Sequence, residues 1–190
     1  MLIEPNQHKG ITRTLKGSQM SVKKYVQIRA DQYKQHDNIW GDLPRDAPIR
    51  LADIFEWILQ NGQTFSGTNM DAADEIVEHS FRTPEIKECY HNALLVPPEV
   101  RYFEGWWAGI IPVEHAWNVV DDEVADVTLT IEQHRERALR DNQEYFGIEI
   151  PRDWAWKQVS KGTHFRPEGS SGPFIYDYVM EQISKEREEE

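Results

Sequence analysis

The sequence predicts an α+β fold in which helices come first, an antiparallel sheet follows, and further helices end the chain. Three observations lead to this prediction. Apolar residues recur at helical spacing before residue 96, β-branched and aromatic residues fill 100–129, and helical patterns return after residue 130. Helices and strands are therefore grouped along the chain, which is typical of α+β folds and not of βαβ repeats.

The first half of the chain contains one imperfect helical stripe, followed by three predicted helical segments. Residues 21–35 carry an imperfect apolar stripe, and residues 51–61 (LADIFEWILQN) carry a clear one that Gly62 would end. Residues 69–81 begin at Asn69, a residue type that caps helices well. The third segment, PEIKECYHNALLV, starts at a proline and ends before a Pro-Pro pair.

The second half predicts a sheet between residues 100 and 129. VRYFEGWWAGI, VEHAWNVV and EVADVTL read as strands, with Asp121-Asp122 as a hairpin turn between the last two. Thr130 would cap a helix through about residue 142, and 144–172 read as irregular. A last helix is expected after Gly172-Pro173.

Length and charge limit the classes of function. The 190 residues fit one domain at 21–185, preceded by a loosely ordered arm at 1–20 and followed by a charged tail at 186–190. With 21 basic and 33 acidic residues, the net charge is −12, which disfavours nucleic acid and anionic membranes as partners. No apolar run reaches the length of about 18 residues of a spanning helix, and the N-terminus lacks a signal-peptide core. A cytoplasmic location is therefore expected.

Cys89 is the only cysteine, which excludes an internal disulfide and any multi-cysteine metal site. It falls early in a predicted helix, where unpaired backbone N–H groups favour a thiolate. Glu85 and Glu88 act in the opposite direction. A lone cysteine on a helix is also commonly a small buried apolar residue, so both interpretations stay open at this point.

His115 lies on the strand VEHAWNVV and is the natural base to pair with the thiol. If Asp121-Asp122 form a two-residue turn, Val120 pairs with Glu123, and every residue pair sums to 243. Asp126 is then a diagonal neighbour of His115 on the same face of the sheet. A carboxylate there would orient the imidazole through its other ring nitrogen, whereas a three-residue turn would place it on the opposite face.

In this order, ECYHNALLV, RYFEGWWAG, PVEHAWNVV and EVADVTL resemble the transglutaminase-like core of the papain-like cysteine protease superfamily. The resemblance covers roughly residues 85–130 and leaves the first 80 residues unexplained. It implies a fold in which the helix bearing the cysteine packs on an antiparallel sheet bearing His and Asp. The residues that carry it are Cys89, Ala93, Arg101, Tyr102, Gly105, His115, Ala116, Trp117, Asp126 and Thr128.

The resemblance also implies a function: a hydrolase or acyltransferase acting on an amide or isopeptide bond through a thioester. Cys89 would be the nucleophile, His115 the general base and then acid, and Asp126 the orienting carboxylate. The chain departs from the pattern at Glu88, where the family has Gly, and at Val127, where it has Pro. The second oxyanion donor is unassigned. A non-catalytic binding protein that reuses the fold is the alternative.

The remaining expectations concern ligands. Trp106, Trp107 and Trp117 are candidate substrate-binding residues, although adjacent strand residues face opposite ways. A protein, a peptide or a small amide is the expected substrate. No cofactor is expected, since neither GxxxxGK[ST] nor GxGxxG occurs. No metal is expected, because no close HxxxH pair occurs.

Overall fold

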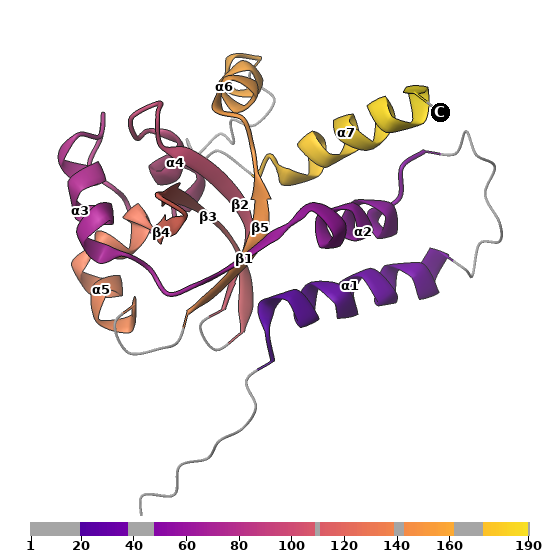
Figure 1. The fold of residues 1–190 in the computed structure, drawn as a ribbon, viewed down its shortest axis with the longest axis horizontal. Helices are drawn as coiled ribbons and strands as arrows, with labels where there is room; N and C mark the ends of the chain where they lie inside the picture. The colour runs from indigo at the N-terminus through magenta and orange to yellow at the C-terminus, as the bar shows by residue number, and fades with distance from the viewer. Residues whose placement is uncertain (1–19, 38–47, 109–110, 139–142, 162–172, 190) are drawn as a thin grey trace, which may run out of the picture.

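The structure, a computed structural model, describes residues 20–37, 48–108, 111–138, 143–161 and 173–189 (Figure 1). The predicted arm at 1–20 lies almost wholly outside these ranges. The described residues form helices and one antiparallel sheet, in the order α1 (Val22–Asp37), α2 (Leu51–Asn61), β1 (Gln63–Ser66), α3 (Met70–Glu78), α4 (Cys89–Leu94), β2 (Arg101–Ala108), β3 (Pro112–Val120), β4 (Glu123–Ala125), the 3₁₀ helix η2 (Val127–Thr130), α5 (Glu132–Ala138), β5 (Glu144–Glu149), α6 (Arg152–Ser160) and α7 (Ile175–Glu189). The predicted α+β class is confirmed.

The five strands lie in the order β1-β5-β2-β3-β4, all antiparallel. The hairpin between β3 and β4 has the predicted register, with Val120 opposite Glu123. Its two turn residues, Asp121 and Asp122, have φ angles of 49° and 63°. Such left-handed values are needed at both positions of the tight turn that matches the twist of a hairpin.

The last predicted strand, EVADVTL, is shorter in the structure than expected. Pairing with β3 ends at Ala125, and residues 127–130 form η2 instead of continuing to Leu129. The cause is local: the Asp126 side chain accepts a hydrogen bond from the Thr128 N–H at 3.0 Å and so caps the 3₁₀ turn. This ending takes Asp126 out of the sheet ladder just beyond its last pair.

The two edges of the sheet approach each other. After β1 the chain reaches β4, where the Asn69 N–H donates to the Val124 carbonyl at 2.7 Å. The Thr68 hydroxyl donates to the same carbonyl at 3.2 Å. These bonds bring the two edge strands of the curled sheet toward each other, and they place Thr68 beside Asp126.

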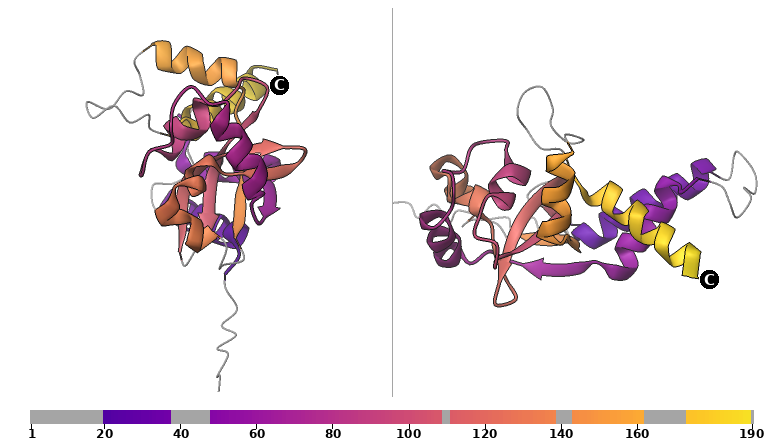
Figure 2. Two further views of the ribbon diagram at one scale, coloured as in Figure 1. Left: turned by 90° about the vertical axis from the view of Figure 1, so that its left-hand side faces the viewer. Right: turned by 90° about the horizontal axis from the view of Figure 1, so that it is seen from above.

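The two faces of the sheet have different partners. Tyr102 and Trp106 of β2 join a core shared with α1, α2 and α7, which gather on one side of the molecule in Figures 1 and 2. Phe103 on the opposite face packs with Trp117 and Tyr145 in a separate aromatic cluster inside the curl. Burial on both faces stabilises the sheet and lets its inner face enclose polar groups.

Several predicted boundaries need correction. The third helical segment is reduced to α4, and Lys87 just before it has a φ of 66° that no helix continues through. Residues 144–172 were expected to be irregular but contain β5 and α6. The charged tail expected at 186–190 is helical through Glu189, since Lys, Glu and Arg are good helix formers that extend α7. β1 was not predicted.

None of the helices in the described part of the chain combines the length and apolarity that crossing a membrane requires.

Glu104 is a fully buried carboxylate on the outer face of β2. It accepts hydrogen bonds from the backbone N–H groups of Phe174 and Ile175, at 2.7 and 2.8 Å, and from the Tyr102 hydroxyl at 2.5 Å. Burial raises the pKa of Glu104 to about 8, even though these three donors act to lower it. Glu104 therefore fixes the start of α7 to the sheet.

We predict that Glu104 makes folding stability fall with rising pH. Because its pKa is higher in the folded chain than the ordinary glutamate value of 4.5, its contribution is present below pH 4.5 and is lost as the pH rises toward 8, at up to about 1.4 kcal/mol per pH unit. Urea unfolding of wild type and Glu104→Gln between pH 5 and 8 measures this. The variant should give the flatter profile; parallel profiles would show that Glu104 is ionised in both states.

Candidate active site

Cys89 is the first residue of α4 and is partly exposed. A residue at this place has no carbonyl one turn earlier in the helix to receive its backbone N–H. The loop before it is held by Asn92, whose amide donates to the Glu85 carbonyl at 2.7 Å and accepts from the Glu85 N–H at 2.9 Å. Asn92 also donates to Thr128 at 3.3 Å, which joins α4 to η2.

His115 and Asp126 form the central contact of the site. The His115 Nε2 atom lies 2.6 Å from Asp126 Oδ2. His115 is 7% exposed and Asp126 is 0% exposed. The predicted hairpin register brings them together, although Asp126 lies one residue beyond the end of β4 and is not paired with Trp117. The second carboxylate oxygen, Oδ1, accepts from the Thr128 N–H.

Cys89 lies close enough to His115 to affect the pKa of its imidazole. Because Asp126 binds Nε2, the ring nitrogen left for the thiol is Nδ1. Burial lowers the pKa of His115, but the opposite charges of Asp126 and Cys89, with hydrogen bonds from both, outweigh burial and raise it to about 10. The three side chains predicted from the sequence are therefore brought together, with the imidazole between thiol and carboxylate.

Aromatic rings surround the imidazole. The Trp107 ring centroid lies 5.6 Å and the Tyr145 centroid 6.4 Å from that of His115. Trp107 is partly exposed, as a residue lining a substrate groove must be. Trp106 and Trp117 are 3% and 0% exposed, so their prediction as substrate-binding residues is wrong: each belongs to a core cluster, because both faces of the sheet are covered.

The C-terminal end of α4 is held by Arg152. Its guanidinium donates to the carbonyls of Leu94 at 2.7 Å, Ala93 at 3.0 Å and Val100 at 2.5 Å. Arg152 is 9% exposed, and burial lowers its pKa to about 10. A cation at this end of a helix also complements the helix dipole. The helix that carries Cys89 is thus fixed from its far end.

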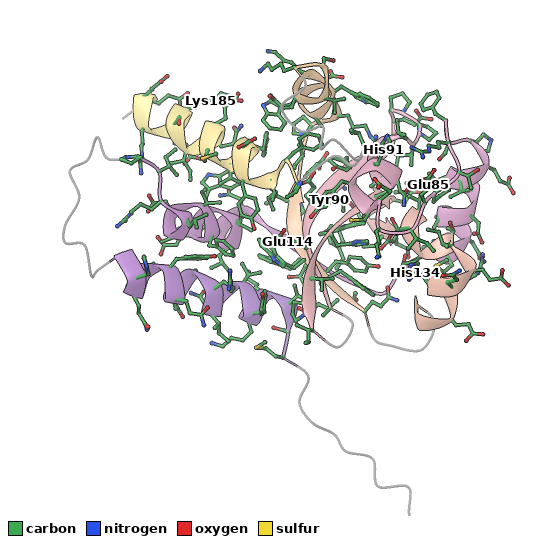
Figure 3. The ribbon with its side chains drawn as sticks, turned by 180° about the vertical axis from the view of Figure 1, so that it is seen from behind. Glu85, Tyr90, His91, Glu114, His134 and Lys185 are labelled. Carbon is green, nitrogen blue, oxygen red and sulfur yellow. The ribbon has the colours of Figure 1, made fainter. Side chains whose placement is uncertain are left out.

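Polar groups also flank Cys89 on the side of α7. Burial is the main reason that the pKa of Tyr90 is raised. Nearby Glu104, Cys89, Glu114 and Tyr176 raise it further. The Tyr176 hydroxyl donates to Glu114 at 2.5 Å. Figure 3 shows Tyr90 and Glu114 close together, and His91 on another side of α4. His91 instead approaches Arg82 at 3.3 Å.

Within the ranges that the structure describes, no group of three His, Cys, Asp or Glu side chains is placed to hold a metal ion. A cavity of about 540 Å³ lies between residues 64–69 and 122–124. Thr68 borders it, and the Thr68 Oγ1 atom accepts from the Asp126 N–H at 3.3 Å. The cavity therefore lies behind Asp126, and Cys89 and His115 do not line it.

No family model, curated protein or solved structure matches this chain. The geometry of the site is therefore the basis for any statement about function.

Sequence reasoning missed the residues that support the three central side chains. Asn92 and Thr128 lie in quoted motifs, but nothing local marks them as partners. Tyr145 belongs to β5 and Arg152 to α6, both in the region expected to be irregular. The one available signal was a basic residue amid aromatic ones in the segment PRDWAWK, which is weak.

We predict that Arg152→Met destabilises the fold by about 2 kcal/mol, because it leaves the Val100 and Leu94 carbonyls buried without their donor. Urea unfolding at pH 7 measures the loss. Arg101→Met is the matched control: its ion pairs with Asp122 and Glu149 are solvent-exposed and should contribute less than about 1 kcal/mol. Equal losses in the two variants would contradict the role of Arg152.

Proposed function

We propose that the protein is a cysteine-dependent hydrolase or acyltransferase that acts on amide or isopeptide bonds through a thioester on Cys89. The observation that carries the proposal is the His115 ring, which reaches Cys89 on one side and bonds Asp126 at 2.6 Å on the other. Nucleophile, base and orienting group in this sequence are the minimal set for covalent acyl transfer. The resemblance to the transglutaminase-like core supports the same assignment.

The first half of the reaction forms the thioester. The Cys89 sulfur attacks the amide carbon, and its proton resides on His115. The carbonyl oxygen becomes an oxyanion, for which the Cys89 backbone N–H is the first donor. The C–N bond then breaks, and the departing amine takes the proton from His115. The step requires no cofactor, because it transfers an acyl group and a proton and involves no oxidation or reduction.

The second half releases the acyl group. Water or an amine gives a proton to His115 as it attacks the thioester carbon, and the Cys89 sulfur leaves and regains that proton. Asp126 holds the ring in one orientation and stabilises the imidazolium that forms twice in the cycle. The choice between water and an amine decides hydrolase or transferase. A protein, a peptide or a small amide is the proposed substrate.

We predict that Cys89 reacts rapidly with iodoacetamide at pH 6. A thiolate paired with an imidazolium stays ionised there, so the labelling rate should change little between pH 6 and 8. An unassisted thiol with a pKa of about 8.5 slows about tenfold per pH unit below it. Intact-mass spectrometry reports the rate directly, because Cys89 is the only cysteine.

His115→Ala should restore the steep pH dependence of an unassisted thiol. His91→Ala is the matched control, since His91 lies on the same helix and its ring approaches Arg82 at 3.3 Å. Labelling of the native protein that is slow at every pH and rises only on unfolding would contradict the proposal. It would favour the alternative of a non-catalytic binding protein with a protected thiol.

We predict that Asp126→Asn slows labelling at pH 6 at least tenfold, because the loss of its charge lowers the pKa of His115. The variant should also lose the part of the pH dependence of folding stability that comes from His115. The His115 pKa of about 10 exceeds the ordinary histidine value of 6.5, so its contribution to stability is present below pH 6.5 and disappears as the pH rises toward 10. The free energy of unfolding in urea should fall between pH 8 and 9.5 for wild type and change less over this range for Asp126→Asn.

Asp122→Asn is the control for that substitution. Its side chain belongs to the same hairpin but is 92% exposed. A change in Asp122→Asn as large as that in Asp126→Asn would assign the effect to general charge and not to the site.

A further inference from the structure

Tyr145 lies directly behind the carboxylate of the proposed triad. Its hydroxyl is 3.2 Å from Asp126 Oδ2, the same oxygen that binds His115. Tyr145 and Asp126 are both 0% exposed. A buried carboxylate depends on its donors, because no water compensates for a lost hydrogen bond.

The hydroxyl of Tyr145 lies near two acceptors but has one proton to donate. Its oxygen also lies 2.8 Å from Gln143 Oε1. A tyrosine hydroxyl has one proton and cannot donate to both Asp126 and Gln143. Gln143 is only 2% exposed, and its buried Nε2 group has no hydrogen-bond partner among the residues that the structure describes.

One change removes the conflict of donors and gives Nε2 a partner. Turning the Gln143 amide by 180° exchanges its nitrogen and oxygen. Nε2 then donates to the Tyr145 oxygen, and the tyrosine proton is directed to Asp126. The Thr68 hydroxyl, which also approaches Tyr145, donates to the Val124 carbonyl and accepts from the Asp126 N–H.

We propose that Gln143 and Tyr145 form a donor chain that positions the Asp126 carboxylate, in the order Gln143 to Tyr145 to Asp126. This inference rests on the proposed function, and it extends the site by two positioning residues. They touch neither the thiol nor a substrate. Their effect reaches Cys89 through the orientation of Asp126 and then of His115.

The opposite face of the sheet offers a matched control. Tyr102 is also fully buried, and its hydroxyl donates to a buried carboxylate, that of Glu104, at 2.5 Å. Glu104 binds the start of α7 and does not contact His115. Tyr102→Phe therefore removes a buried tyrosine hydrogen bond to a carboxyl group that does not contact His115.

The test is a double-mutant cycle on the rate of Cys89 alkylation by iodoacetamide at pH 6. Tyr145→Phe keeps the ring and should slow labelling about tenfold, the effect of losing a hydrogen bond to a charged group. In the Asp126→Asn background the same substitution should add little, because the charged acceptor is already gone. Tyr102→Phe should leave the rate unchanged in both backgrounds.

Equal rates for Tyr145→Phe and wild type, or an equal further loss in the Asp126→Asn background, would overturn the inference. Asp126→Ala provides a second background if Asp126→Asn does not fold. The proposed function fails separately: if wild-type Cys89 labels slowly and independently of His115, the triad itself is absent.

Gln143→Met tests the direction of the chain. If Nε2 donates to Tyr145, losing it should slow labelling to between the wild-type and Tyr145→Phe rates. If Oε1 instead takes the tyrosine proton, its removal would release that proton to Asp126, and labelling would stay constant or become faster. The second result would overturn the order of donors.

Discussion

The hydrogen bond between His115 and Asp126 is the interaction on which the rest of the site depends. An isolated carboxylate that is 0% exposed is costly, and a cationic partner with further donors offsets that cost. The fold meets this requirement by ending β4 at Ala125. The carboxylate then turns under the imidazole, one oxygen bonding His115 and the other capping η2. If β4 continued by one more residue pair, Asp126 Oδ1 would lose the Thr128 N–H as its donor.

The sheet buries a second carboxylate, and the two differ in their partners. Glu104 is surrounded by neutral donors that hold α7 in place, and burial raises its pKa to about 8. Asp126 is paired with an ionisable ring that also reaches a thiol. The first arrangement serves to join two elements. The second places a buried pair of ionisable groups beside a partly exposed thiol, that of Cys89.

The sequence predicted the parts of the site that local rules decide. A two-residue turn fixes hairpin register, so His115 and Asp126 could be brought together by counting. β5 could not be recognised, because its segment EYFGIE has two glutamates and a glycine. Its strand structure comes from lying between β1 and β2. The order of strands places Tyr145 behind Asp126, and only the assembled sheet determines that order. The burial of Trp106 and Trp117 was not predicted, because strand alternation does not indicate whether both faces of a sheet are covered.

The position of Cys89, the proposed nucleophile, is set by the tertiary structure and not by its helix alone. α4 has six residues, too few to be stable by itself. It is held by Asn92 at one end and at the other by Arg152, with Asn118 donating to the Ala93 carbonyl at 2.9 Å. These contacts come from the loop, from α6 and from β3. Removing any of them would move Cys89 relative to a histidine that the sheet keeps fixed. The geometry of the pair is therefore set by residues far from it in sequence.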